Sequence, residues 1–151
     1  MSEMNSTANA VNSAEYEIIG KAILSLIEQC SELPSGVKFD YQAVNGNNHI
    51  GFLTAPGSMY TFEGIYGDFE AQLPFQILYK VSATDSVHML NAETLLDSIA
   101  NQLPNMSYPA LTDNRVIKRI RFDSITYRST ADQDGSVVFI RNGTVKYEKN
   151  I

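Results

Sequence analysis

The chain has 151 residues, of which 44% are hydrophobic and 19% charged, and it carries a formal net charge of −6. This length suits one domain, and such a chain buries enough surface to form a core without disulfides or metals. The acidic balance argues against a general nucleic-acid binder, because backbone phosphates require a cationic face. The longest apolar stretches fall short of the roughly 18 residues that span a bilayer. The single cysteine, Cys30, suits a reducing compartment.

Charge is unevenly distributed along the sequence. The first 114 residues hold 3 Lys/Arg and 13 Asp/Glu, whereas residues 115–151 hold 8 Lys/Arg and 4 Asp/Glu. A bipolar subunit of this kind can associate with copies of itself or with a charged partner. A chain of this size also shows such a division by chance, so both interpretations stay open.

The first predicted element is an amphipathic helix. Residues 1–12 are rich in Ser, Asn and Ala, which predicts a disordered N-terminal arm, followed by a single domain over residues 13–151. The helix begins near Ser13, with Asn12 or Ser13 as its cap, and Pro34 and Gly36 follow its end. Apolar side chains recur at steps of three and four residues and predict its buried face: Tyr16, Ile19, Ile23, Leu26, Ile27 and Cys30.

A meander of four strands is predicted after this helix. The alternating pattern places the strands at residues 37–44, 49–54, 59–66 and 72–82. Asn45-Gly46 predicts a hairpin turn between the first two strands, because both residues tolerate positive φ. Pro56-Gly57 predicts the next turn.

Two features of the third and fourth strands bear on the core. In the third strand we expect Tyr60, Phe62 and Ile65 to point inward. Pro74 in the fourth strand cannot donate a ladder hydrogen bond, so we expect it at a sheet edge or at the start of the strand. Strict alternation predicts one buried face for the fourth strand: Leu73, Phe75, Ile77, Tyr79 and Val81.

The pattern then changes to a helical period. Asp85 or Ser86 caps a second helix that runs to about Leu103, where Pro104 stops it. Its apolar stripe is predicted to consist of Val87, Leu90, Leu95, Ile99 and Leu103.

Three more strands complete the prediction. Residues 115–128 form a long strand whose apolar phase slips, which indicates a bulge near Asp123 and Ser124. Residues 136–141 and 144–148 form a hairpin around Asn142-Gly143. The order α-β-β-β-β-α-β-β-β predicts an α+β fold, with a mostly antiparallel sheet of six to seven strands and two helices packed on one face.

Motifs for catalysis or metal binding are not found in the sequence. His49 and His88 lack the spacings of metal or catalytic pairs, and Cys30 falls on the apolar face of the first helix, where a thiol packs as a small hydrophobe. We therefore predict no catalytic, cofactor-binding or metal site. Three carboxylates, Glu63, Asp68 and Glu70, are the best candidates for a carboxylate site, and an exposed acidic rim is the alternative.

Four basic residues share the strand that begins at residue 115: Arg115, Lys118, Arg119 and Arg121. Few aromatic residues lie between them, so the strand does not resemble a single-strand nucleic-acid platform. We expect either an interface with acidic groups of a neighbouring subunit or a solvated strand face.

The middle of the chain resembles a known family. The string Thr61-Phe62-Glu63-Gly64, the strand Leu73-Pro74-Phe75-Gln76-Ile77-Leu78-Tyr79-Lys80 and a helix with Ala92 and Leu95-Leu96-Asp97-Ser98-Ile99 resemble tail terminator proteins of long-tailed bacteriophages. These are also labelled minor capsid or tail-completion proteins. The resemblance extends in element order over roughly residues 14–148.

The resemblance implies a structural virion protein without cofactors. Its subunits form a ring, usually a hexamer, that caps the tail tube, ends its polymerisation and joins it to the head connector. DNA is then only passing cargo, no membrane is involved, and the location is the head-proximal end of the tail, after assembly in the host cytoplasm. One alternative is a small acidic protein-binding module of immunity or secretion-accessory type. Another is an enzyme that uses Glu63, Asp68 or Glu70 with His49.

Overall fold

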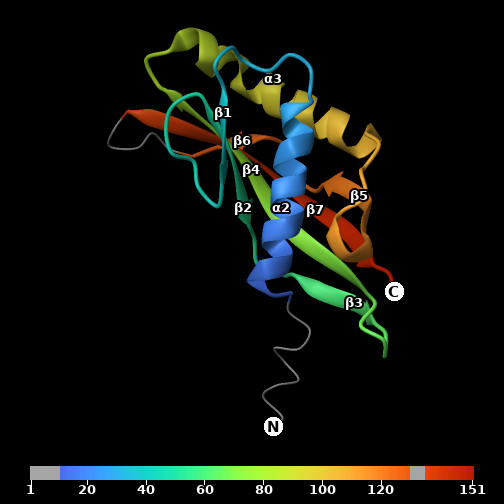
Figure 1. Ribbon diagram of the computed structural model, residues 1–151. Coiled ribbons are helices and arrows are strands. Elements are labelled where there is room, and N and C mark those ends of the chain that lie inside the picture. The colour runs from blue at the N-terminus through green and yellow to red at the C-terminus, as the bar shows by residue number, and fades with distance from the viewer. Residues whose placement is uncertain (1–10, 130–134) are drawn as a thin grey trace.

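The computed structural model describes residues 11–129 and 135–151 (Figure 1). Its helices and strands, in chain order, are α2 (Ser13–Glu28), β1 (Lys38–Tyr41), β2 (His49–Thr54), β3 (Met59–Glu63), β4 (Phe69–Ser82), α3 (Ser86–Gln102), the 3-10 turns η1 (Leu103–Asn105) and η2 (Thr112–Asn114), β5 (Arg115–Phe122), β6 (Tyr127–Arg128) and β7 (Ser136–Lys149). Most of the predicted N-terminal arm lies outside the described residues. Val11 is buried, and Asn12 caps α2 by accepting a hydrogen bond from the Glu15 amide.

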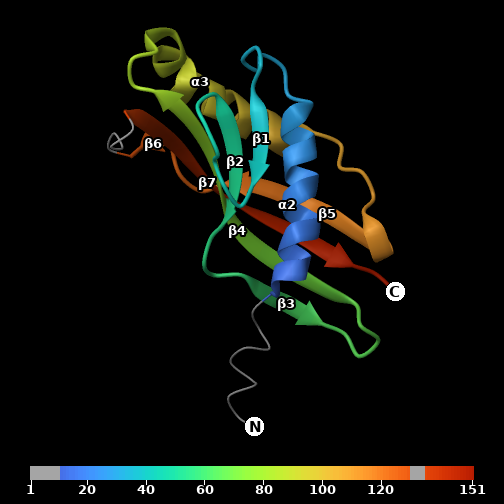
Figure 2. The ribbon, with the colours of Figure 1, turned by 60° about the vertical axis from the view of Figure 1, so that its left-hand side comes forward.

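The seven strands form one sheet in the order β1-β2-β4-β7-β5, with β3 paired to β4 and β6 paired to β7. The two 14-residue strands β4 and β7 pair along their whole length and form the centre of the sheet. Figures 1 and 2 show α3 at one end of the sheet and the turn between β3 and β4 at the other. The predicted α+β class, with two helices and a mostly antiparallel sheet, is confirmed.

The core lies between the two helices and one face of the sheet. The predicted alternation of β4 is confirmed, because its inward residues Leu73, Phe75, Ile77, Tyr79 and Val81 are at most 1% exposed. Every predicted apolar residue of α2 is buried as well, Cys30 included. A row of rings runs from Tyr41 through Phe52 and Phe75 to Phe122, with successive centroids 5.4–5.8 Å apart.

The predicted hairpin at Asn45-Gly46 is wrong, because β1 and β2 are parallel. Positive φ occurs instead at Gln42 and Asn48, on either side of a connection that crosses over β2. A Cβ on Gly51 would collide with the carbonyl oxygen of Ala43 in this connection, so the crossing requires glycine at that position.

Asp40 fastens the crossing connection. Its Oδ2 accepts hydrogen bonds from the Asn45 amide and from the Nδ1 of His49, both at 2.8 Å. Burial raises the pKa of Asp40, but these two hydrogen bonds outweigh it and the pKa lies below the ordinary value.

A carboxyl whose pKa is depressed by folding stabilises the folded state above its unfolded pKa, and this contribution is lost as the pH falls through the folded pKa. We therefore expect the stability advantage of the wild-type protein over Asp40→Asn to shrink between pH 6 and pH 3. Urea unfolding of both proteins across this range measures the difference. An advantage that stays constant over this range would contradict the assigned role of the carboxylate.

The predicted turn at Asn142-Gly143 is also wrong, since both residues lie inside the continuous strand β7. Gly143 sits beneath two aromatic side chains, and a Cβ there would lie 2.7 Å from the Cζ of Phe75 and 3.1 Å from the Cδ1 of Phe122. The missing side chain makes room for the edge-to-face pair of these rings.

Pro74 occupies a central strand rather than an edge or a strand start. Its carbonyl accepts hydrogen bonds from the amide of Ala55 and the hydroxyl of Tyr16, on the side where β2 has ended and β3 has not yet begun. In an antiparallel strand the nitrogen and carbonyl of one residue face the same side. The missing N–H of Pro74 therefore costs no ladder hydrogen bond.

The buried faces of β3 and α3 differ from the prediction. A register shift between Tyr60 and Phe62 turns Phe62 outward in β3, and Ile65 lies in the turn beyond the strand. In α3 the exposed residues Val87 and Leu90 lie off the buried face, which consists of Ala92, Leu95, Leu96, Ile99 and Ala100.

The predicted strand over residues 115–128 is interrupted between β5 and β6, both of which pair with β7.

Candidate interaction surfaces

The candidate catalytic residues do not come together. His49 pairs with Lys80 at one end of β4, whereas Glu70 lies ten positions earlier on the same strand. At about 3.3 Å per residue the two are roughly 33 Å apart. His49 is hydrogen-bonded to Asp40 and belongs to the crossing connection. The histidine and the acidic group of the enzymatic alternative therefore lie at opposite ends of the sheet.

The surroundings of Cys30 and of the acidic residues do not favour a reactive or metal-binding site. Burial raises the pKa of the Cys30 thiol to about 11, so the thiolate nucleophile is scarce at neutral pH. Over residues 11–129 and 135–151, no three His, Cys, Asp or Glu side chains are grouped to hold a metal ion. No helix in these two ranges is long and apolar enough to cross a membrane.

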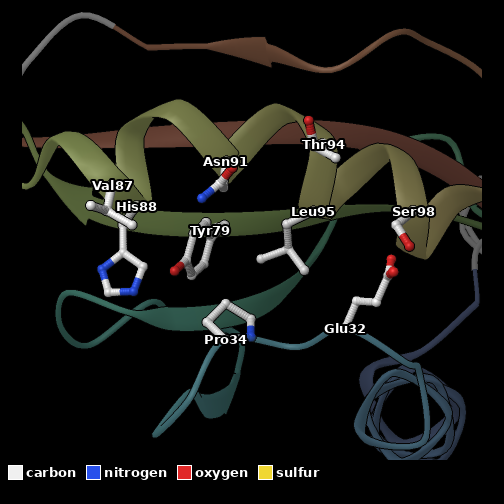
Figure 3. Close-up of a pocket in the computed structure, with 9 residues that line it drawn as sticks. All are labelled: Glu32, Pro34, Tyr79, Val87, His88, Asn91, Thr94, Leu95 and Ser98. Atoms are coloured by element: carbon white, nitrogen blue, oxygen red, sulfur yellow. The ribbon is translucent and has the colours of Figure 1, made fainter.

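One pocket, of about 330 Å³, opens between α3 and the segment after α2 (Figure 3). Burial raises the pKa of Tyr79 to about 12, and its hydroxyl donates to the Oδ1 of Asn48. Ser98 accepts a hydrogen bond from the Gln102 amide, while the His88 ring is bonded to Asp85. The hydroxyl and the imidazole thus have separate partners, and the pocket does not form a nucleophile–base pair. Its lining comprises Glu32, Pro34, Tyr79, Val87, His88, Asn91, Thr94, Leu95 and Ser98.

Arg115, the first residue of the predicted basic interface, is only 6% exposed. Its guanidinium bonds both carboxylate oxygens of Glu15 in α2, with Nε–Oε1 at 3.0 Å and Nη2–Oε2 at 2.6 Å. The Tyr147 hydroxyl donates to the same carboxylate at 2.7 Å. Burial raises the pKa of Glu15, but its bonds to Arg115 and Tyr147 outweigh this effect and lower it. This buried triad joins α2 to β5 and β7 and leaves Arg115 little surface for a neighbour.

No pattern in the sequence indicates this triad. Arg115 lies 100 positions and Tyr147 132 positions from Glu15 along the chain. Glu15 also reads as an ordinary acidic residue in the first turn of a helix, where it interacts favourably with the helix dipole.

The remaining basic residues of β5 lie on the sheet face opposite the helices. Lys118, Arg119 and Arg121 are exposed, and Arg119 is paired in register with Lys146 of β7. We call these four residues the basic face. Three of them have acidic neighbours: Lys118 with Glu148 at 3.5 Å, Arg121 with Asp123 at 2.8 Å and Lys146 with Glu70 at 3.4 Å. Among the described residues, Arg119 forms no ion pair.

A second surface is formed by residues 59–70, which we call the β3–β4 hairpin. Three of its large hydrophobic side chains point into solvent: Phe62 is 56% exposed, Ile65 89% and Tyr66 76%. The predicted carboxylate candidates lie in the same hairpin, where Glu63 is exposed and Glu70 is bonded to Thr61 and Lys146. Exposed apolar side chains gathered in this way typify a contact surface rather than a solvated loop.

The fold has a counterpart among solved structures. A chain in the virion of a native gene transfer agent (GTA) particle superposes with a TM-score of 0.53 at 11% sequence identity, over 88% of this chain and 98% of that chain. At this identity the similarity is one of fold. No protein-family model matches the sequence, and no curated protein matches it either.

Proposed function

We propose that this chain is a structural subunit of a phage-like particle, and that it acts there as the tail terminator. The observation that carries the proposal is the shared fold with a virion chain, which spans 98% of that chain and most of this one. The resemblance to tail terminators in local sequence and element order supports the same proposal. An α+β domain of this kind needs no catalytic residue to serve in a particle.

The proposed activity is to form a ring that caps the tail tube, ends its polymerisation and meets the head connector. Opposite charges on one subunit suit a ring, because a head-to-tail interface joins one face of a subunit to a different face of the next. The net charge of −6 suits a channel through which DNA passes without adhering. The proposed location is the head-proximal end of the tail.

The proposal is tested by measuring particle mass in solution over a concentration series, with negative-stain images of any large species. We expect a closed ring of about six subunits, each of 16.7 kDa. A monomer at every concentration that binds one other protein tightly would favour the alternative, a small acidic module of immunity or secretion-accessory type.

The basic face is the proposed ring interface on one side of the subunit. We expect Arg119→Glu/Arg121→Glu to convert rings into monomers, because like charges now face the acidic side of the neighbour. Lys21→Glu/Lys38→Glu is the matched control, since it makes the same change in net charge at exposed positions elsewhere. Loss of rings in the control as well would show that total charge, and not the basic face, governs assembly.

A further inference from the structure

The β3–β4 hairpin presents apolar groups that the subunit itself does not cover. Phe62, Ile65 and Tyr66 are all more than half exposed, and Figures 1 and 2 show their turn at the end of the sheet away from α3. The hairpin is nevertheless well held. β3 pairs with β4, and the Gly64 amide donates to the carbonyl of Asp68 at 2.7 Å. These side chains are thus presented by an ordered element.

The hairpin and the basic face have opposite charge. Residues 59–70 contain Glu63, Asp68 and Glu70 and no Lys or Arg, whereas the basic face consists of four Lys/Arg, of which Arg119 has no ion-pair partner among the described residues. The two surfaces therefore complement each other electrostatically, and each would repel a second copy of itself.

Within one subunit these two surfaces adjoin at the ion pair between Glu70 and Lys146, at 3.4 Å, whereas β3 itself lies apart from Arg119. A row of paired residues runs across it, from Met59 in β3 through Gln72 and Lys146 to Arg119 in β5. Three strand spacings of about 4.8 Å separate the ends of this row by roughly 14 Å. β3 and β5 thus border opposite sides of the same part of the sheet, so the hairpin residues of β3 reach Arg119 and Arg121 only on a different copy.

We propose that the β3–β4 hairpin of one copy docks on the basic face of the next. Phe62 and Tyr66 pack on the methylene stems and guanidinium planes of Arg119 and Arg121, where aromatic rings and cations attract each other. The exposed carboxylate of Glu63 supplies the opposite charge. Such an interface is heterologous and repeats around a ring. The inference rests on the proposed function, and it identifies the two surfaces that form the contact between neighbouring subunits.

The first test removes the apolar groups from the hairpin. We expect Phe62→Ser/Ile65→Ser/Tyr66→Ser to stay folded, because all three side chains are exposed, and to lose the ring completely in the mass measurement. The matched control is Val87→Ser/Leu90→Ser/Ile125→Ser, which removes three exposed hydrophobic side chains elsewhere and retains the ring. Circular dichroism and thermal melting check that both variants fold.

The second test mixes two defective proteins. The hairpin variant keeps an intact basic face, and Arg119→Glu/Arg121→Glu keeps an intact hairpin. Alone, each is expected to be a monomer. An equimolar mixture forms dimers of twice the 16.7 kDa subunit and nothing larger, because only one competent interface exists per pair.

The outcomes separate the two proposals. Rings formed by the wild-type protein and by the hairpin variant alike would overturn this inference and leave the proposed function standing. A mixture that stays monomeric while the wild type forms rings would also overturn it, because the hairpin and the basic face would then not bind each other. A wild-type protein that never associates would contradict both.

Discussion

Replacing Arg115 by alanine is expected to lower the free energy of unfolding by about 3–5 kcal/mol, because the buried carboxylate of Glu15 then loses its charged partner. Both side chains are nearly inaccessible, at 7% for Arg115 and 11% for Glu15. The two hydrogen bonds of the guanidinium are therefore shielded from water in the folded protein. The loss also separates the start of α2 from β5, since this ion pair connects them.

Urea unfolding of the wild type and Arg115→Ala measures the effect. The control is Glu17→Gln on the same helix, which breaks the exposed pair with Lys21 and should cost under about 1 kcal/mol. Tyr147→Phe is expected to give an intermediate loss of free energy of unfolding, because it removes only the third hydrogen bond to Glu15. An Arg115→Ala protein as stable as the Glu17→Gln protein would contradict the role assigned to the triad.

The second large effect is expected at Gly51. A methyl group there meets the carbonyl oxygen of Ala43, which belongs to the backbone and cannot turn aside as a side chain would. Gly51→Ala therefore displaces the crossing connection or the strand β2. We expect the free energy of unfolding to fall by an amount near the upper end of the roughly 1–3 kcal/mol that overpacking a core typically costs.

Gly46→Ala in the same connection is the comparison for Gly51→Ala. The nearest atom to its added methyl is the Nε2 of His49 at 3.3 Å, at the edge of a side-chain ring, and Gly46 has ordinary φ. We expect little change in its unfolding midpoint in urea. Equal midpoints for both variants would show that the connection does not lie over β2 as described.

Local patterns predicted those elements in which local preference and tertiary packing agree. The face of α2 from Tyr16 to Cys30 follows from a helical repeat, and the inward residues of β4 follow from alternation. Asp85 caps α3 as its residue type suggests, by accepting a hydrogen bond from the His88 amide.

The errors arise where a distant segment decides the local structure. Asn142-Gly143 has the composition of a turn, yet the rings of Phe75 and Phe122 lie over Gly143 and favour a continuous strand. Asn45-Gly46 is likewise typical of a hairpin, but the connection runs over Gly51 and makes β1 parallel to β2.

The candidate surfaces could be predicted only in part. Lys118, Arg119 and Arg121 are exposed as an interface strand requires, whereas Arg115 in the same run is buried by a glutamate 100 positions away. The bulge in β3 turned Phe62 outward, and alternation alone had placed it in the core. An interruption of register leaves no mark in composition, so the apolar hairpin emerged only from the structure.

The proposed role of this chain as a tail terminator is tested most directly with the tube-forming protein of the same particle. Tube subunits are allowed to polymerise with and without this chain, and the tubes are examined by negative-stain microscopy. We expect shorter tubes with a ring at one end, and neither effect with the hairpin variant Phe62→Ser/Ile65→Ser/Tyr66→Ser. Tubes of unchanged length with bare ends, at a concentration where this chain forms rings, would contradict the claim.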